Sequence, residues 1–342
     1  MNMQPVSRFF LCSAGILLFV VGGQVSAEGV SESNYAESRA GKTFIQALSD
    51  EHGFERAELT RWLGQAERQD GILKSISTPA EKTLEWHEYR RIFIRDEQIK
   101  DGVAFLDKYP EAFERAENEF GVSKYIIAAI IGVETRYGRY LGSHRVLDAL
   151  ATLAFDYPPR STFFRRELGE FFLMTREQDF DPLEVKGSYA GAMGYGQFIS
   201  SSYRHYAIDF DGDKVADLLT NPVDAIGSVA NYFARHGWGS GAPVAEQIRD
   251  AGALDANSAL LTTGLKPSRT VSDYRTAGLS PEAGVSDDEP ARAILLQGED
   301  EPQLWLTYKN FYVITRYNHS HLYGMAVLEL SDALRSLHEE SS

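Results

Sequence analysis

The chain has 342 residues, a single cysteine and a formal net charge of −15. This acidic balance argues against nucleic acid as a partner, because phosphate binding needs clustered Lys and Arg, and the basic pairs are limited to Arg90-Arg91 and Arg165-Arg166. The 17 Tyr, 19 Phe and 4 Trp residues suit a groove that stacks on sugar rings, although most aromatic side chains fill cores.

Residues 1–27 have the pattern of a secretory signal peptide. Arg8 precedes an apolar run from Phe9 to Val21, and the small residues of Val25-Ser26-Ala27 stand before Glu28. The alternative is an uncleaved anchor, for which the run is short and is followed by two glycines. Cys12 lies early in the run and forms no lipoprotein box, so we expect an exported chain whose mature form has no cysteine.

Residues 28–120 are predicted to form a helical lobe. Apolar residues recur at three- and four-residue spacing in Thr43–Leu48, Arg56–Gln65 and Trp86–Tyr109. Gly53, Gly71 and Pro79 interrupt this pattern.

Residues 121–240 are predicted to form the catalytic core. The run Tyr125–Val133 is uninterrupted by charge and leads directly into Glu134, which would lie at the end of a buried helix. Burial raises the pKa of a carboxyl group, so this glutamate could keep its proton near neutral pH and donate it. The alternative is a solvated glutamate in the last turn of the helix.

An acidic loop within this core, residues 209–224, resembles the first half of an EF-hand. Alternate acidic residues present oxygen atoms to one hard cation, with Ca²⁺ the natural ion, and we expect the ligands Asp209, Asp211, Asp213 and Val215. Lys214 replaces the usual turn glycine, and Thr220 stands where a glutamate is usual. The alternative is a solvated acidic loop without an ion.

Residues 241–304 change in character and contain more Gly, Pro, Ser and Asp. The runs Ala293–Gln297 and Gln303–Tyr308 flank a Gly-Glu-Asp turn in the pattern of a hairpin, which predicts a small β-containing insert. Residues 305–342 are predicted to return to the core, with helical spacing from Tyr312 to Leu334. The predicted fold class is therefore mainly α (α+β).

Four ordered segments resemble the lytic murein transglycosylase B family, glycoside hydrolase family 103, from about residue 40 to the end of the chain. They are GVETRYGRYLG (132–142), GSYAGAMGYGQF (187–198), DAIGSVANYF (224–233) and NFYVITRYNHSHLYGMAV (310–327). The resemblance implies a lysozyme-like core with an added helical lobe and a small β lobe. It also implies that the substrate is the glycan strand of peptidoglycan and that catalysis needs no cofactor.

The resemblance assigns the role of single catalytic acid to Glu134. It would protonate the oxygen that links MurNAc to GlcNAc and then take the proton of the MurNAc 6-hydroxyl, which leaves a 1,6-anhydro-MurNAc end. Ordinary glycosidases use two carboxylates, but Asp148 and Asp156, the nearest downstream acids, match no catalytic position of the family. We therefore expect the substrate's N-acetyl group to help stabilise the oxocarbenium-like charge.

The resemblance also implies a set of substrate-binding residues. Ser188 matches a hydroxyl beside the acid, and Arg160 falls where relatives carry paired arginines, although Pro159 precedes it here. Without the family, each tyrosine would more often be a core residue and Ser188 a turn residue. The remaining matches line the cleavage subsites or the groove: Gln197, Phe198, Tyr89, Tyr232, Tyr317 and Tyr323. Asp224 matches the family's closing calcium ligand.

The signal peptide and the missing lipoprotein cysteine predict a periplasmic enzyme, although relatives are often lipid-anchored. We also expect a monomer, and the sequence does not identify partners in the wall machinery. Two alternatives remain open. A hydrolytic muramidase would let water attack, and its products would be heavier by one water than anhydro products. A non-catalytic peptidoglycan-binding scaffold would have a decayed site, against which the presence of Glu134, Ser188 and Gln197 counts.

Overall fold

The computed structural model describes residues 34–77, 84–249, 260–261, 263–281 and 284–341. The predicted signal peptide, residues 1–27, lies outside the described residues. Within the described part of the chain, no helix combines the length and the apolar character needed to span a membrane.

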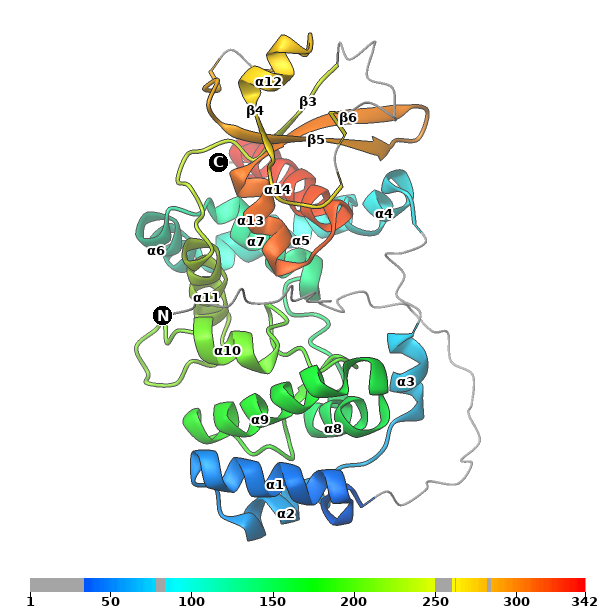
Figure 1. Ribbon diagram of the computed structural model, residues 1–342. Coiled ribbons are helices and arrows are strands. Elements are labelled where there is room, and N and C mark those ends of the chain that lie inside the picture. Colours follow the sequence, from blue (N-terminus) through cyan, green and yellow to red (C-terminus); the bar gives the residue numbers. More distant parts are fainter. Residues whose placement is uncertain (1–33, 78–83, 250–259, 262, 282–283, 342) are drawn as a thin grey trace, which may run out of the picture.

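One group of helices occupies the lower half of Figure 1. Aromatic side chains fill the space between them, and the ring of Trp62 stacks on that of Phe172 with 5.5 Å between centroids. The group consists of a 3₁₀ turn (Tyr35–Glu37), α1 (Arg39–His52), α2 (Arg56–Leu63), α3 (Asp70–Ile76), α8 (Val146–Asp156), a second 3₁₀ turn (Pro158–Arg160) and α9 (Ser161–Glu177).

A second group lies above it and surrounds α7 (Lys124–Thr135). Every residue from Tyr125 to Thr135 is buried, which explains why this segment has no polar face. The helices around it are α4 (Trp86–Phe93), α5 (Asp96–Lys108), α6 (Pro110–Phe120), α11 (Pro222–Arg235), α13 (Lys309–Tyr317) and α14 (His321–Ser341), while α10 (Ser200–Tyr206) packs between α9 and α11.

The helices of residues 28–120 therefore fall into both groups. α3 packs against α8, whereas α4 and α5 pack against α14 and α6 packs against α7. The prediction that this stretch forms one added lobe is corrected accordingly: periodicity identifies a helix but not which neighbour covers its apolar face.

A four-stranded antiparallel sheet lies at the top of Figure 1, in the order β3-β6-β5-β4. The predicted hairpin is confirmed, since Ile294 pairs with Trp305 and Leu295 with Leu304. β6 continues past the expected boundary at residue 304. The elements of this lobe are β3 (Ala245–Gln247), β4 (Arg269–Thr270), α12 (Val271–Thr276), β5 (Pro290–Gln297) and β6 (Pro302–Tyr308).

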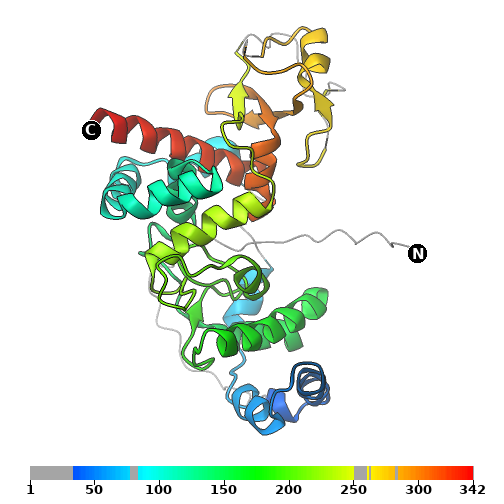
Figure 2. The same ribbon diagram turned by 90° about the vertical axis from the view of Figure 1, so that its left-hand side faces the viewer.

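The lobe has a small core of its own around Tyr274 and Leu306, separate from the main core. Two further short strands, β1 (His144–Arg145) and β2 (Lys186–Gly187), pair with each other beside α8, in the green lower half of Figure 2. The predicted mainly α fold with a small β-containing insert is thus confirmed.

Candidate active site

Glu134 is the penultimate residue of α7 and its side chain is buried, with 6% of the residue exposed. The alternative of a solvated glutamate in the last turn is therefore wrong. Its carboxylate oxygen Oε1 accepts a hydrogen bond of 2.6 Å from the hydroxyl of Tyr323, on α14. The carboxylate thus lies where two helices, distant in sequence, come together.

The chain reverses sharply just after Glu134. Arg136 and Tyr137 both adopt left-handed backbone conformations, with φ of 50° and 57°, which are unusual for residues with a Cβ. The Tyr137 ring then packs onto α7 and α5: a Cβ on Gly132 would lie 2.6 Å from its hydroxyl oxygen, and one on Gly102 only 2.3 Å away. Gly132, two residues before Glu134, is therefore required by close packing.

Tyr317 and Tyr323 lie with their rings nearly parallel, 6.4 Å apart between centroids. Burial raises the pKa of both hydroxyls well above its ordinary value, and the nearby charge of Glu134 adds to this effect. Both phenols therefore stay protonated, and Tyr323 remains a donor to Glu134 at any physiological pH.

Phe198, Tyr232 and Tyr317 extend this pair into an aromatic cluster. The ring of Tyr317 meets that of Tyr232 edge-on at 4.8 Å and that of Phe198 at 5.8 Å. Backbone carbonyls fix the two tyrosines, because Tyr317 donates to Gly196 O and Tyr232 donates to Arg316 O. We call Phe198, Tyr232, Tyr317 and Tyr323 the aromatic wall.

The glycine-dense segment reaches this wall as a tight loop. Met193 and Phe198 pair in an antiparallel bridge, and Gln197 between them has a positive φ of 48°. The Gln197 amide donates to the carbonyls of Gly194 and Leu141, at 2.9 and 3.3 Å. The prediction that Gln197 lines the cleavage subsites stays a prediction, because the contacts of its amide are to backbone carbonyls.

Thr135 is a site residue that the sequence analysis did not single out. Its hydroxyl lies 3.0 Å from the carbonyl oxygens of Ile131 and Tyr195, and it accepts a hydrogen bond from the Gly138 amide. It therefore joins the end of α7 to the glycine loop. The sequence could have pointed to Thr135, because it follows Glu134 directly in the segment that carries the resemblance.

The other predicted substrate residues lie around these elements. Ser188 begins the glycine loop, and its Oγ accepts hydrogen bonds from the amides of Ala190 and Ala192, as expected of a turn residue. Tyr89 is fully buried on α4. Arg160 lies in the α8–α9 connection with its guanidinium over the ring of Phe163, at 4.3 Å.

The acidic loop brings three of the predicted metal ligands together. Carboxylate oxygens of Asp209, Asp211 and Asp213 lie within 4.8 Å of one another on the surface. The Asp209 carboxylate also accepts backbone N–H groups of Gly212, Asp213 and Lys214. These donors lower its pKa despite an opposing effect of desolvation.

Asp224, the predicted closing ligand, is not one of the three grouped aspartates, and its role as a ligand stays a prediction. It is fully buried at the start of α11, and its two carboxylate oxygens accept the backbone N–H groups of Phe210, Asp211 and Asp217. Burial raises its pKa to about 6 despite these donors. Asp224 therefore supports the loop from beneath. Val215 lies within the loop, and its backbone N–H donates to the Asp213 carboxylate.

A surface hollow lies beside the acidic loop, and Glu134 is not among its lining residues. It is lined by Arg115, Phe120, Phe210 and Asn231, together with the loop itself. The Arg115 guanidinium lies over the Phe210 ring at 3.6 Å and donates to its carbonyl, so this cation is already engaged. The hollow contains none of the residues of the aromatic wall.

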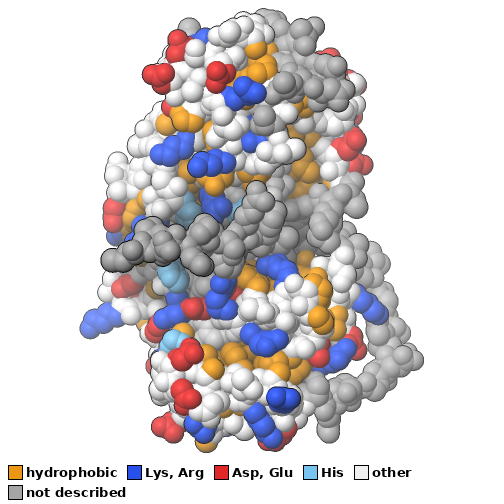
Figure 3. All heavy atoms as spheres, in the orientation of Figure 1, with side chains coloured by type: hydrophobic (Ala, Val, Ile, Leu, Met, Phe, Trp, Pro, Cys, Tyr) orange, Lys and Arg blue, Asp and Glu red, His pale blue; other side chains and the backbone are white. Residues whose placement is uncertain are grey.

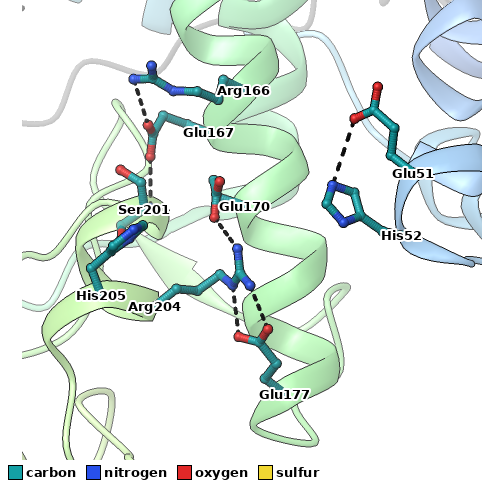
Figure 4. Close-up of polar contacts among 9 residues, drawn as sticks. All are labelled: Glu51, His52, Arg166, Glu167, Glu170, Glu177, Ser201, Arg204 and His205. Atoms are coloured by element: carbon teal, nitrogen blue, oxygen red, sulfur yellow. Dashed lines mark hydrogen bonds and ion pairs between the residues drawn. The ribbon is translucent and has the colours of Figure 1, made fainter. Parts of the chain in front are cut away.

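A polar network joins α9 to α10 (Figure 4). Glu167 is buried, and its Oε2 accepts a hydrogen bond of 2.9 Å from the backbone N–H of Ser201, while Arg166 approaches its other oxygen at 3.5 Å. Arg204 forms a second contact by pairing with Glu170 and Glu177 on α9. α10 begins two residues after Phe198, so these contacts fix the C-terminal end of the glycine loop to α9.

Comparison with known proteins agrees with this geometry. A transglycosylase SLT domain matches residues 36–332. Membrane-bound lytic murein transglycosylase B of Escherichia coli K12 is 43% identical over 310 residues, which cover 88% of this chain and 84% of that protein.

Solved structures are similar over nearly the whole chain. Catenated SltB1 from Pseudomonas aeruginosa is 45% identical with a TM-score of 0.84, covering 89% of this chain and 99% of that one. Escherichia coli Slt35 in complex with calcium is 42% identical with a TM-score of 0.81, covering 91% and 97%. SltB3 from Pseudomonas aeruginosa in complex with NAG-anhNAM-pentapeptide is 27% identical with a TM-score of 0.77, covering 86% and 78%.

The family model and the Escherichia coli relative each span most of the chain, and the solved relatives share its lysozyme-like core. The chain therefore belongs to the lytic transglycosylases that carry the transglycosylase SLT domain.

Proposed function

We propose that the chain, a lytic transglycosylase by its family, cleaves the β-1,4 bond between MurNAc and GlcNAc in peptidoglycan glycan strands and leaves a 1,6-anhydro-MurNAc end. One observation carries the proposal: the buried carboxylate of Glu134 is held by Tyr323 beside the aromatic wall. The NAG-anhNAM-pentapeptide bound by SltB3 supports this product.

In the first half of the reaction, protonated Glu134 gives its proton to the bridging oxygen while the C1–O bond breaks. In the second half, the resulting carboxylate takes the proton of the MurNAc 6-hydroxyl as that oxygen bonds to C1. Glu134 ends as it began and no water is consumed, so one carboxyl group serves as acid and then as base. The N-acetyl group of the substrate would stabilise the positive charge at C1.

The two other acids considered as partners are occupied by structural contacts. Asp148 is buried and paired with Arg145 at 2.6 Å, and it also accepts the backbone N–H of Glu67. Asp156 accepts the hydroxyl of Tyr35 and lies 3.5 Å from Arg68. This supports a mechanism with one carboxyl group in place of the usual two.

For the substrate-binding residues we propose two kinds of role. Tyr323 would orient Glu134 through its hydrogen bond, and the buried Tyr89 and Tyr317 would support that pair from within the core. Gln197, Phe198 and Tyr232 would shape the cleavage subsites at the glycine loop. Ser188 and Arg160 would contact the strand further along, where Arg160 is half-buried beside Phe163.

For the metal we propose Ca²⁺ in the acidic loop, held by side-chain oxygens of Asp209, Asp211 and Asp213 and the backbone carbonyl of Val215. The close approach of the three carboxylates and the calcium complex of Slt35 support this. The ion would neutralise the loop's negative charge and would take no part in catalysis. Asp224 would act beneath it, by holding the loop backbone.

We further propose that the chain is exported to the periplasm by residues 1–27 and acts as a monomer. The Escherichia coli relative is described as membrane-bound. Here Cys12 lies within the apolar run and would leave with it, so no cysteine would remain to carry a lipid.

Product mass tests the proposed reaction. Purified glycan strands treated with the enzyme should give fragments that are lighter by one water than the corresponding hydrolysis products. Glu134→Gln should keep the fold and the binding of strands, because an amide oxygen still accepts from Tyr323, yet lower the rate by about 10²–10⁴-fold. Fragments carrying the added water would show a muramidase, and a well-folded, active Glu134→Gln variant would refute the assignment of Glu134.

A further inference from the structure

Arg316 stands out among the basic residues near the aromatic wall. It is the residue before Tyr317, at the end of α13, and its side chain is partly exposed. Its guanidinium Nη1 lies 3.1 Å from His319 Nε2. Among the described residues no carboxylate lies within ion-pair distance of it, although 49 of the 342 residues are acidic.

The surroundings of Arg316 carry further basic groups. His236 stacks on Tyr232 with 4.0 Å between ring centroids, and Tyr206 packs against both rings. Burial lowers the pKa of His236, and the charges of Arg316 and Arg235 lower it further. On the face drawn in Figure 3, Lys, Arg and His side chains lie both above and below the middle, with Asp and Glu side chains among them.

A series of contacts through three tyrosines links residue 316 to the reacting group. Tyr232 donates to the backbone carbonyl of Arg316, meets Tyr317 edge-on, and Tyr317 in turn lies parallel to Tyr323, the donor to Glu134. A strand placed for cleavage at Glu134 along the aromatic wall would pass Tyr232 and the adjoining Arg316, whose guanidinium pairs with no carboxylate of the described residues. Arginine binds carboxylates through two parallel N–H donors, which suits this position to an acidic ligand group.

We propose that Arg316 binds a carboxylate of the peptidoglycan strand and so fixes the strand along the aromatic wall. The inference rests on the proposed function and adds the substrate group that is recognised. Two sources share this chemistry. A MurNAc without a peptide carries a free lactyl carboxylate, whereas a MurNAc with a stem peptide has that group in an amide and offers the peptide's carboxylates instead.

The experiment measures binding in the Glu134→Gln background, so that its result does not depend on which bond is cut. Three kinds of strand are compared: peptide-free strands, peptide-free strands whose lactyl carboxylates are converted to methylamides, and peptide-bearing strands. Arg316→Gln is compared with Arg316→Lys and with Arg335→Gln, which removes the same charge from an exposed position on α14 over Tyr125. The contact from Tyr232 is retained in every variant, because it is made to the backbone of residue 316.

We expect Arg316→Gln to raise Kd about three- to tenfold for strands that carry the recognised carboxylate and to leave the methylamide strands unchanged. Arg316→Lys should retain part of the affinity, and Arg335→Gln should change nothing. A loss on peptide-free strands identifies the lactyl carboxylate, and a loss on peptide-bearing strands alone identifies a peptide carboxylate.

Equal losses on the methylamide strands would overturn the proposal, since they would show a merely structural role. Unchanged binding of both acidic strands would also overturn it. Failure of the proposed function would be recognised separately, because hydrolytic products from the wild-type enzyme would leave these binding constants unaffected.

Discussion

Glu134 owes its position to the burial of α7 on all sides and its hydrogen bond to a residue on another helix. A buried carboxylate without a donor would destabilise the fold, because it loses its contacts with water and gains none in return. The hydroxyl of Tyr323 supplies this donor, and the high pKa of Tyr323 keeps it protonated. We therefore expect the hydrogen bond between Tyr323 and Glu134 to contribute both to stability and to catalysis.

Removal of that hydroxyl should affect both properties. In Tyr323→Phe the ring packing is retained but the Glu134 oxygen loses its donor, so we expect kcat to fall at least about tenfold and the free energy of unfolding to fall by about 1–3 kcal/mol. Steady-state kinetics and urea unfolding measure the two effects. Tyr274→Phe removes a hydroxyl that accepts from Ala293 in the β lobe, and it should lower stability alone. An unchanged kcat in Tyr323→Phe would contradict the role of this contact.

At this scale the sequence, with the family resemblance, predicted the buried carboxyl group of Glu134 but not its hydrogen-bond partner. An apolar run that ends in glutamate is compatible with a buried carboxyl group, but local spacing alone leaves a solvated glutamate open. Tyr323 lies 189 residues away, and without the family resemblance nothing in its local sequence distinguishes it from the other tyrosines. Residue type therefore predicts which chemistry is possible, whereas the assembly of the helices decides which residues carry it out.

The end of α7 is held by contacts between elements. The Tyr137 ring packs between α5 and α7 where glycines leave room for it, and the left-handed turn at Arg136 and Tyr137 directs it there. Gly132→Ala should therefore lower the free energy of unfolding by about 1–3 kcal/mol, because the new methyl group would overlap the ring. Thermal and urea unfolding test this.

Gly71→Ala is the matched control for this substitution. Gly71 lies in α3 with nothing within 4 Å of an added Cβ, so the same change there should be neutral or stabilising by up to about 1 kcal/mol. Equal stability of Gly132→Ala and the wild type would show that the Tyr137 ring can move aside at no cost.

The acidic loop brings three carboxylates close together, and we expect a bound cation to stabilise it. Addition of about 10 mM CaCl₂ should raise Tm by several degrees, since an ion that binds only the folded chain stabilises it, while MgCl₂, which prefers a tighter octahedral site, should do less. The pair Asp209→Asn and Asp213→Asn should abolish the response, and Asp70→Asn, an exposed aspartate on α3, should retain it. A persistent response in the loop variant would place calcium elsewhere.

Across the whole molecule, the sequence predicted whether a segment is helix or strand better than it predicted which other elements that segment packs against. The hairpin of β5 and β6 and the helices at both ends are local patterns and were predicted correctly. The division of residues 28–120 between two groups of helices depends on contacts such as α3 with α8 and α4 with α14, which are far apart in the chain. Periodicity carries no information about such pairings.

The stability of the whole molecule should depend on pH through Glu167, whose pKa is raised by burial at the α9–α10 contact. Below the ordinary glutamate pKa of 4.5 both states hold the proton; as pH rises, the unfolded chain ionises first, so the contribution of this group to stability is lost. Urea unfolding from pH 4 to pH 7.5 should therefore show that the free energy of unfolding of Glu167→Gln increases relative to that of the wild type as pH rises. Glu340 is exposed on α14, so Glu340→Gln should show the same pH dependence of the free energy of unfolding as the wild type. A constant difference for Glu167→Gln would mean that Glu167 ionises as easily in the folded chain as in the unfolded one.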